Sequence, residues 1–195
     1  MLSMPFAAQN FERLVGTPGF SETMLRNHFK LYEGYVKNTN DLVDKFRAAA
    51  KAGQSSYELA EMRRRFGWEF NGMRMHDLYF GNMVKGGKPL DKNSSLLKRI
   101  AEQFGSFDAW AADFKAVGSA RGIGWAVLYL DRATGQLFNV WINEHDVGHL
   151  TGGVKLLVMD VFEHAYMLDY GIKRADYIDA FFRAIDWKTV EARLI

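Results

Sequence analysis

The sequence predicts an α+β protein: a long N-terminal α-helical hairpin followed by an α/β C-terminal domain with a three-stranded antiparallel sheet. Apolar residues recur at three- and four-residue spacing through the first half of the chain. A charged stretch rich in Gly and Pro, 85–94, interrupts this pattern, and beyond 124 two apolar runs flank a turn sequence. We therefore expect two domains, 1–87 and 88–195.

Two long amphipathic helices make up the predicted hairpin. Ser21 is suited to cap the first, over about 22–50, and His28 lies on its apolar stripe. The second follows the break at 53–55, and its stripe runs from Leu59 to Met83 through His76. Each imidazole therefore points into the seam between the two helices.

The C-terminal half begins with short helices and continues as a sheet. One helix starts at Ser94 or Ser95 and ends at Gly105, and Ser106 caps the next. Strands are expected at 125–130 and 137–142, around a turn at 131–135, with a third at 155–159. Two helices, near 174–185 and 187–194, close the chain.

Composition removes several classes of protein. The chain has 195 residues, 48% of them hydrophobic, which is enough for a packed core. A net charge of +2 argues against a nucleic-acid partner, and the basic run 63–65 is better explained as a solvated helix face. Cys is absent, so any metal must be held by N and O ligands.

The N-terminal stretch does not resemble a secretory signal. The first charged residue is Glu12, and Pro5 and Gln9 interrupt the apolar residues before it. The longest apolar runs, such as 125–130, are far shorter than the ~20 residues of a membrane-spanning helix. We expect a cytoplasmic protein without a membrane partner.

Three histidines and one aspartate form the candidate site. His28 and His76 occupy apolar stripes, although either could be a core histidine satisfied by one hydrogen bond. Asp160 ends an apolar strand, and a buried carboxylate needs a cationic partner unless it only caps the next turn. His164 follows four residues later. Three imidazoles and a carboxylate suit Fe, Mn or Zn and leave an open coordination position.

Residues 160–170, DVFEHAYMLDY, resemble the Asp-x-Trp-Glu-His-Ala-Tyr signature of iron/manganese superoxide dismutases. The segments 21–40 and 71–80 resemble the two ligand-bearing helices of that family, and Gly122-Ile-Gly-Trp125 resembles the start of its first strand. The resemblance spans most of the chain. By it, the metal ligands are the four residues that burial also selects: His28, His76, Asp160 and His164.

The resemblance implies a superoxide dismutase that converts superoxide to O₂ and H₂O₂ with one Fe or Mn ion per subunit, bound between the two domains. It further implies a homodimer or a dimer of dimers. The alternative is a non-catalytic metal-binding or structural protein on the same fold.

Further roles follow from the same resemblance. Tyr35 corresponds to the gateway tyrosine, Trp125 to the aromatic wall over the metal, and His145 to the residue that hydrogen-bonds to metal-bound solvent and tunes the redox potential. Glu163 would reach the partner subunit's His164. Positive charges that attract the anionic substrate would come from Lys30 and Arg174.

The sequence also departs from the family pattern. Counting back from Tyr35 without a gap reaches Asn27, so the choice of His28 assumes a one-residue shift; His28, Tyr32 and Tyr35 share one helix face. Tyr32 and Met167 replace the usual His and Tyr of a contact across the dimer. Phe80 and Phe162 stand where Trp is common.

Overall fold

The computed structural model describes residues 5–194 and confirms the predicted fold class. Its elements, in chain order, are η1 (Glu12–Leu14), α1 (Glu22–Lys51), α2 (Tyr57–Gly81), α3 (Ser95–Phe104), α4 (Phe107–Ser119), β1 (Gly124–Asp131), β2 (Leu137–Asn143), β3 (Gly153–Asp160), η2 (Glu163–Ala165), α5 (Met167–Tyr170), α6 (Arg174–Arg183) and α7 (Trp187–Ala192). Each predicted helix and strand lies within about two residues of its expected bounds. The three short elements η1, η2 and α5 were not predicted.

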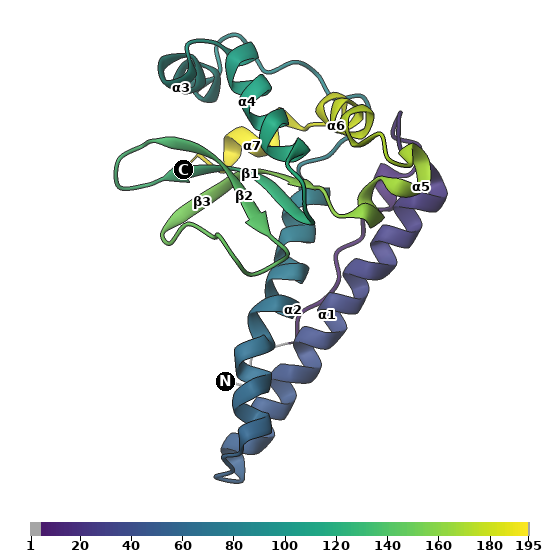
Figure 1. Cartoon of the computed structure of the whole chain (residues 1–195), viewed down its shortest axis with the longest axis vertical. Coiled ribbons are helices and arrows are strands. Elements are labelled where there is room, and N and C mark those ends of the chain that lie inside the picture. Colours follow the sequence, from purple (N-terminus) through teal and green to yellow (C-terminus); the bar gives the residue numbers. More distant parts are fainter. Residues whose placement is uncertain (1–4, 195) are drawn as a thin grey trace.

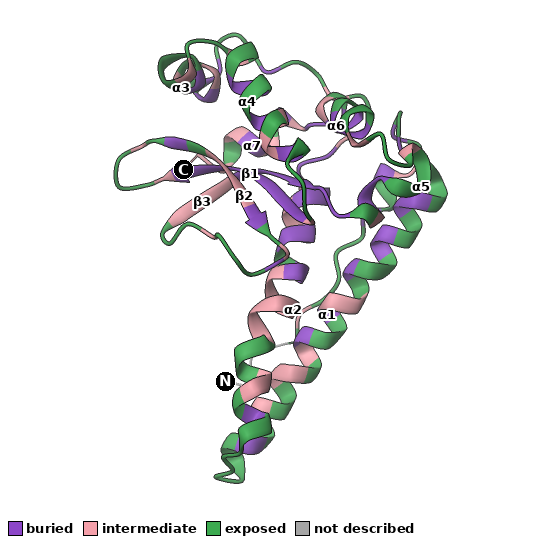
Figure 2. Ribbon diagram, in the orientation of Figure 1, coloured by how far each residue is buried: buried purple, intermediate pink, exposed green. Residues whose placement is uncertain are grey.

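The helices α1 and α2 form an antiparallel hairpin that projects from the α/β part of the molecule (Figure 1). Serine side chains start both, since Ser21 accepts from the Met24 amide and Ser56 from the Leu59 amide. Figure 2 shows exposed residues toward the far tip and buried ones where the hairpin meets the rest of the chain. The apolar stripes therefore do most of their packing at the near end.

The three strands form one antiparallel sheet in the order β2-β1-β3. The central strand β1 is buried almost throughout, with α4 packed against β1 and β2 and α2 against β3. Its start requires glycine, because a Cβ on Gly124 would meet the Ile142 carbonyl oxygen at 2.0 Å. This explains the glycine before Trp125 in the sequence.

Asn82, at the end of α2, fixes the hairpin to the sheet. Its side chain donates to the Val158 carbonyl at 3.2 Å and accepts from the Val158 amide at 2.9 Å. Asn82 is fully buried, so these bonds are shielded from water. The junction holds α2 against β3 at the level of the candidate site.

The segment before α1 packs along the hairpin. The backbone of Phe6 exchanges two hydrogen bonds with the Asn40 side chain, and the Gln9 amide donates to the Tyr32 hydroxyl at 2.9 Å.

Within residues 5–194, none of the helices has the length and apolar character that crossing a membrane requires.

Candidate metal centre

Four side chains from distant parts of the chain meet at one point. His28 comes from α1, His76 from α2, Asp160 from the end of β3 and His164 from η2. Each offers one potential ligand atom, and these atoms all lie within 4.8 Å of one another. Two ligands about 2.1 Å from one ion span up to about 4.2 Å, so the cluster is close to metal-binding dimensions.

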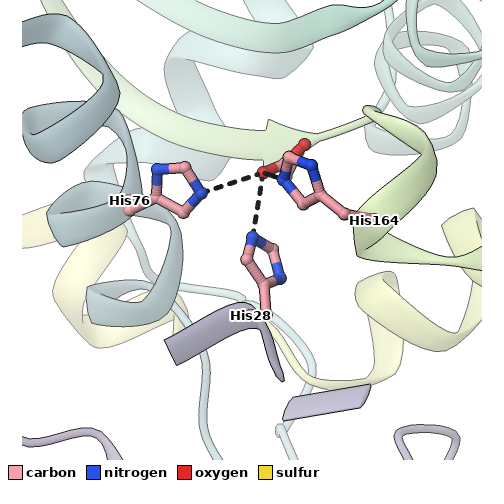
Figure 3. A group of neighbouring side chains, drawn as sticks. His28, His76 and His164 are labelled. Atoms are coloured by element: carbon pink, nitrogen blue, oxygen red, sulfur yellow. Dashed lines mark hydrogen bonds and ion pairs between the residues drawn. The ribbon is translucent and has the colours of Figure 1, made fainter. Parts of the chain in front are cut away.

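The three imidazoles converge on a single carboxylate oxygen (Figure 3). The Oδ2 atom of Asp160 lies 3.1 Å from Nε2 of His28, 3.3 Å from Nε2 of His164 and 3.5 Å from Nε2 of His76. The other oxygen, Oδ1, accepts from the Phe162 amide at 2.9 Å. That bond orients the carboxylate so that Oδ2 faces the histidines.

The sheet positions Asp160, and the helical hairpin positions His28 and His76. In the β1–β3 register Trp125 pairs with Asp160, so the central strand fixes where the aspartate lies. His28 and His76 are buried in the hairpin seam and lie ring against ring, with centroids 5.0 Å apart. The structure places His28 in the cluster, while Asn27 is exposed.

The protonation state of His76 can be read from its partners. Its Nδ1 lies 2.6 Å from the Gly72 carbonyl oxygen, which can only accept, so Nδ1 carries the hydrogen. Burial lowers the pKa of His76 well below its ordinary value, so the ring is neutral and Nε2 presents a lone pair. Among residues 5–194, that buried Nε2 has no hydrogen-bond partner, and it faces an anionic oxygen. A metal cation between these two acceptors would satisfy both of them.

Electrostatics favour the same conclusion. Burial would raise the pKa of Asp160, but His164 and His28 outweigh it and hold the pKa below its ordinary value. Burial lowers the pKa of His28. One ionised carboxylate and three imidazole nitrogens are a donor set for a transition metal such as iron or manganese, and the residues fit that cofactor.

A second set of hydrogen bonds surrounds the cluster. The indole Nε1–H of Trp125 donates to Nδ1 of His145 at 3.1 Å, which leaves the hydrogen of the neutral ring on Nε2. His145 is neutral because burial lowers its pKa to about 4. Its Nε2 lies 2.8 Å from the Tyr35 hydroxyl oxygen and therefore donates to it. The proton of Tyr35 remains available to another acceptor.

The loop that carries His145 is anchored by a histidine four residues later. Nε2 of His149 donates to the His145 carbonyl at 2.9 Å, and the Tyr129 hydroxyl lies 3.1 Å from Nδ1 of His149. Just before His145, Glu144 has φ 51°, a left-handed conformation that is uncommon outside glycine. These contacts turn His145 inward, where it is fully buried.

Tyr35 lies against the cluster. Its ring stacks on His76 with centroids 5.2 Å apart, and burial raises its pKa to about 12. It can approach this closely because residue 72 is glycine: a Cβ there would meet the Tyr35 ring at 2.5 Å. Gly72 thus leaves room for the Tyr35 ring, and its carbonyl oxygen accepts a hydrogen bond from Nδ1 of His76.

Three predicted residues lie outside this cluster. Lys30 is exposed and ion-paired with Glu33 at 3.1 Å. Arg174 donates to the Ala120 and Gly122 carbonyls and to the Tyr166 hydroxyl. Glu163 is exposed on η2 and lines a surface hollow of about 410 Å³ together with His164.

The structure also shows the surroundings of the residues that depart from the family pattern. Tyr32 turns into its own subunit, donating to Asp77 at 2.5 Å. Met167 is exposed. The ring of Phe80 lies 4.8 Å from that of His28, and the ring of Phe162 stacks on His145 at 4.7 Å.

Sequence reasoning missed three residues of the surroundings. Trp68 lies with its ring 4.9 Å from that of His145, and the Arg65 guanidinium sits 4.0 Å above Trp68. His149 was not assigned a role. Helical spacing relates Arg65 to Trp68 and Trp68 to His76, but it could not connect α2 with the loop of His145.

Comparison with known proteins places the chain in a family. Residues 92–193 match the C-terminal domain model of iron/manganese superoxide dismutases. The chain is 38% identical to the iron superoxide dismutase of Aquifex pyrophilus over 181 residues, which cover 90% of this chain and 84% of the relative. It is 37% identical to a manganese superoxide dismutase of Haloferax volcanii, covering 90% and 87%. With the fold and the His–Asp cluster, these matches show that the chain belongs to the iron/manganese superoxide dismutase family.

Proposed function

We propose that this protein catalyses the dismutation of superoxide at a site formed by His28, His76, Asp160 and His164. One observation carries the proposal: the unpartnered Nε2 of His76 faces the Asp160 carboxylate inside a buried cluster of four possible ligands. A bound iron or manganese ion would supply the one-electron chemistry, by which one superoxide leaves as O₂ and a second takes up an electron and two protons to leave as H₂O₂.

The ligands have distinct roles in this proposal. Three neutral imidazoles donate without adding charge, and Asp160 contributes one negative charge that favours the higher oxidation state. The Phe162 amide and the Gly72 carbonyl orient Asp160 and His76, as outer hydrogen bonds do in metal sites. We expect one ion per subunit.

Tyr35 is the proposed proton donor at the site. Because His145 donates its only ring hydrogen to the Tyr35 oxygen, the hydroxyl proton of Tyr35 is left for another acceptor, such as the reduced substrate. In this proposal His145 does not itself donate toward the metal site: it holds Tyr35 in place, and Trp125 holds His145. Burial raises the pKa of Tyr35 to about 12, so the hydroxyl is protonated at neutral pH before each turnover.

The activity can be tested with superoxide-consumption assays on protein loaded with iron, with manganese and, as a redox-inert control, with zinc. Turnover by the iron or manganese form, and none by the zinc form, supports the proposal. If both redox-active forms bind stoichiometric metal but fail to consume superoxide, the non-catalytic alternative on the same fold is favoured.

We also propose that two copies of the chain associate through the surface around Glu163. Exposed apolar side chains gather there from α1, α5 and the turn after it: Leu31, Met167, Leu168 and Ile172. They flank hollows lined by Glu163. An apolar patch with an acidic group beside a partly exposed histidine suits a pairing in which Glu163 meets the partner's His164.

Sedimentation of Glu163→Ala at decreasing concentration tests this association. Weaker self-association than wild type is expected, while Glu33→Ala, on the exposed face of α1, should sediment as wild type. An unaltered profile for Glu163→Ala would contradict the bridge. The division into domains 1–87 and 88–195, the attraction of substrate by Lys30 and Arg174, and the cytoplasmic location remain predictions.

A further inference from the structure

A hollow of about 650 Å³ lies among the C-terminal helices. It is lined by the segment before α1, the connection after α2 and residues of α3, α4, α6 and α7. These four helices gather at the end of the molecule opposite the tip of the hairpin (Figure 1). None of the described residues that line the hollow belongs to the metal centre or to the hollows beside Glu163. Small-molecule sites span roughly 300–1,000 Å³, so the hollow is large enough for a ligand.

Apolar side chains from five segments form its walls. Three of them are aromatic, Phe107, Phe182 and Trp187, and the others are Leu90 and Leu97. The Phe107 ring meets Trp187 edge-on, with centroids 5.6 Å apart. Phe107, Phe182 and Leu97 are only partly buried, so their apolar surface is open to a ligand. A flat ring in the hollow would gain edge and face contacts with aromatic neighbours.

Both charged residues that line the hollow are cations, Lys88 and Arg183, and both are exposed. No acidic residue of the described chain lines it. The carboxylates that flank Arg183 in the sequence are used elsewhere: Asp179 pairs with Lys115 at 2.7 Å, and Asp186 caps the start of α7. The charge of the hollow is therefore complementary to an anionic ligand.

Hydrogen bonds and close packing hold the walls together. The Val84 amide donates to the Ala184 carbonyl at 2.8 Å, which ties the connection after α2 to the end of α6. Gly87 lies so close to α6 that a Cβ there would meet the Arg183 carbonyl oxygen at 2.6 Å. On the other side, Glu191 of α7 accepts from the Ser95 amide at 2.8 Å and from its hydroxyl at 3.0 Å. The hollow is thus formed by the fold itself, as ligand sites usually are.

We propose that this hollow binds a small aromatic carboxylate, with its ring against the aromatic wall and its carboxylate toward Arg183 and Lys88. A guanidinium can donate two parallel hydrogen bonds to one carboxylate, which a neutral ligand cannot match. Three aromatic side chains in one wall favour a ring over an acyl chain. The site goes beyond the proposed function and takes no part in the dismutation of superoxide.

Titration calorimetry of the metal-loaded protein with 2-naphthoate tests the proposal. We expect one molecule to bind per chain with a dissociation constant below about 1 mM, as the size of this ligand allows. Two comparison ligands separate the ring from the charge. 2-Naphthylmethanol keeps the ring without the charge, and decanoate keeps the charge without the ring; each should bind about threefold more weakly or worse.

Three variants that each make the net charge one unit less positive locate the site. Arg183→Gln should weaken the binding of 2-naphthoate about two- to fivefold, since it removes an exposed ion pair. Leu97→Glu should weaken it about tenfold or more, because a repelling charge replaces an apolar contact. Lys98→Gln is the matched control: Lys98 is exposed on α3, next to Leu97 in the sequence and outside the hollow, so binding should equal that of wild type.

Several results would overturn the proposal. If 2-naphthoate does not bind at millimolar concentration, the hollow is not a site for this class of ligand. Equal affinity for 2-naphthylmethanol would show that the cations do not select a carboxylate, and equal affinity for decanoate that the aromatic wall does not select a ring. An equal loss of binding in Lys98→Gln would reduce the effect to net charge. A changed sedimentation profile of Leu97→Glu would show that a second copy of the chain covers this face instead.

Discussion

The metal cluster and the hydrogen-bond network around it differ in whether their polar atoms have hydrogen-bond partners. In the cluster, Nε2 of His76 has no hydrogen-bond partner within the described part of the chain, and three imidazoles surround one oxygen of Asp160. In the network, each ring nitrogen of His145 and His149 has a partner within 3.1 Å. Only the network is satisfied by the protein itself.

This difference suggests separate roles: a metal ion would stabilise the cluster, whereas the protein alone positions Tyr35 through the network. A bound cation would stabilise the cluster, because buried acceptors that face one another cost free energy. The hydrogen bonds of the network involve only side chains and backbone of this chain, so the network can hold Tyr35 in position throughout a reaction. Changes in the two regions should therefore have separable effects, and the following variants are ordered by expected size.

The largest effect is expected from His76→Ala. Loss of Nε2 removes one of the four ligands, so tight binding of iron or manganese should be lost, together with the stabilisation that metal provides. That stabilisation is about 4 kcal/mol when metal exceeds its dissociation constant a thousandfold. Metal content by elemental analysis and unfolding with and without metal measure both. His149→Ala, the control from the network, should keep near-stoichiometric metal; a metal content near wild type in His76→Ala would contradict its role as a ligand.

The next effect concerns His145 in the metal-free protein. Its pKa is lowered from 6.5 to about 4 in the folded state, so the unfolded chain takes up the proton first as the pH falls. The stability contributed by the neutral ring is complete above pH 6.5 and is lost as the pH falls through 4. The loss amounts to ~3 kcal/mol.

Urea unfolding of wild type and His145→Gln at pH 7, 5.5 and 4 isolates this contribution. Asp160, His28 and His76 are common to both proteins, so their titration largely cancels. We expect wild type to lose ~3 kcal/mol relative to the variant between pH 7 and 4. A difference that does not change with pH would show that His145 is not held neutral by burial.

Gly72→Ala should disturb the contact between the network and the cluster, where the Tyr35 ring stacks on His76. Its Cβ would meet the Tyr35 ring at 2.5 Å, so the ring must move away from His76, at a cost of about 1–3 kcal/mol. Gly67→Ala on the same helix is the matched control, since its nearest atom would lie 3.9 Å away, and it should stabilise the protein by up to ~1 kcal/mol. Equal stability of the two variants would mean that Tyr35 does not require Gly72.

The smallest effect is expected from Tyr129→Phe. It removes the hydroxyl beside Nδ1 of His149 and should lower the free energy of unfolding by about 1 kcal/mol. Metal content should not change, because no ligand contacts this end of the network. Tyr57→Phe, at an exposed position, provides the control. Loss of metal from Tyr129→Phe would show that the network and the cluster are not separable.

The sequence predicted the elements and the cluster well for physical reasons. Long apolar stripes and capping serines define α1 and α2 locally, and a carboxylate at the end of an apolar strand demands a cation wherever the chain folds. His28 rather than Asn27 followed from the shared helix face with Tyr35. These inferences needed only the spacing of residues along a helix and the free-energy cost of burying a charged group.

The surroundings of the cluster could not be predicted in the same way. Tyr32 finds Asp77 on the neighbouring helix, and Trp68 finds His145 on a loop far along the chain. The cations show the limit most clearly. Lys30 lies on the same helix as His28, yet its side chain turns to Glu33, and Arg65, which is exposed as expected, lies over the Trp68 ring. Tertiary contacts decide such directions.

The pairing of Trp125 with Asp160 on adjacent strands has a consequence for assembly. Because side chains alternate across a sheet, sliding β3 by one residue would turn Asp160 away from the histidines and break its alignment with the tryptophan that holds His145. Only the correct register yields a complete coordination sphere. A metal ion held by these four residues would therefore stabilise the correct strand register over a shifted one.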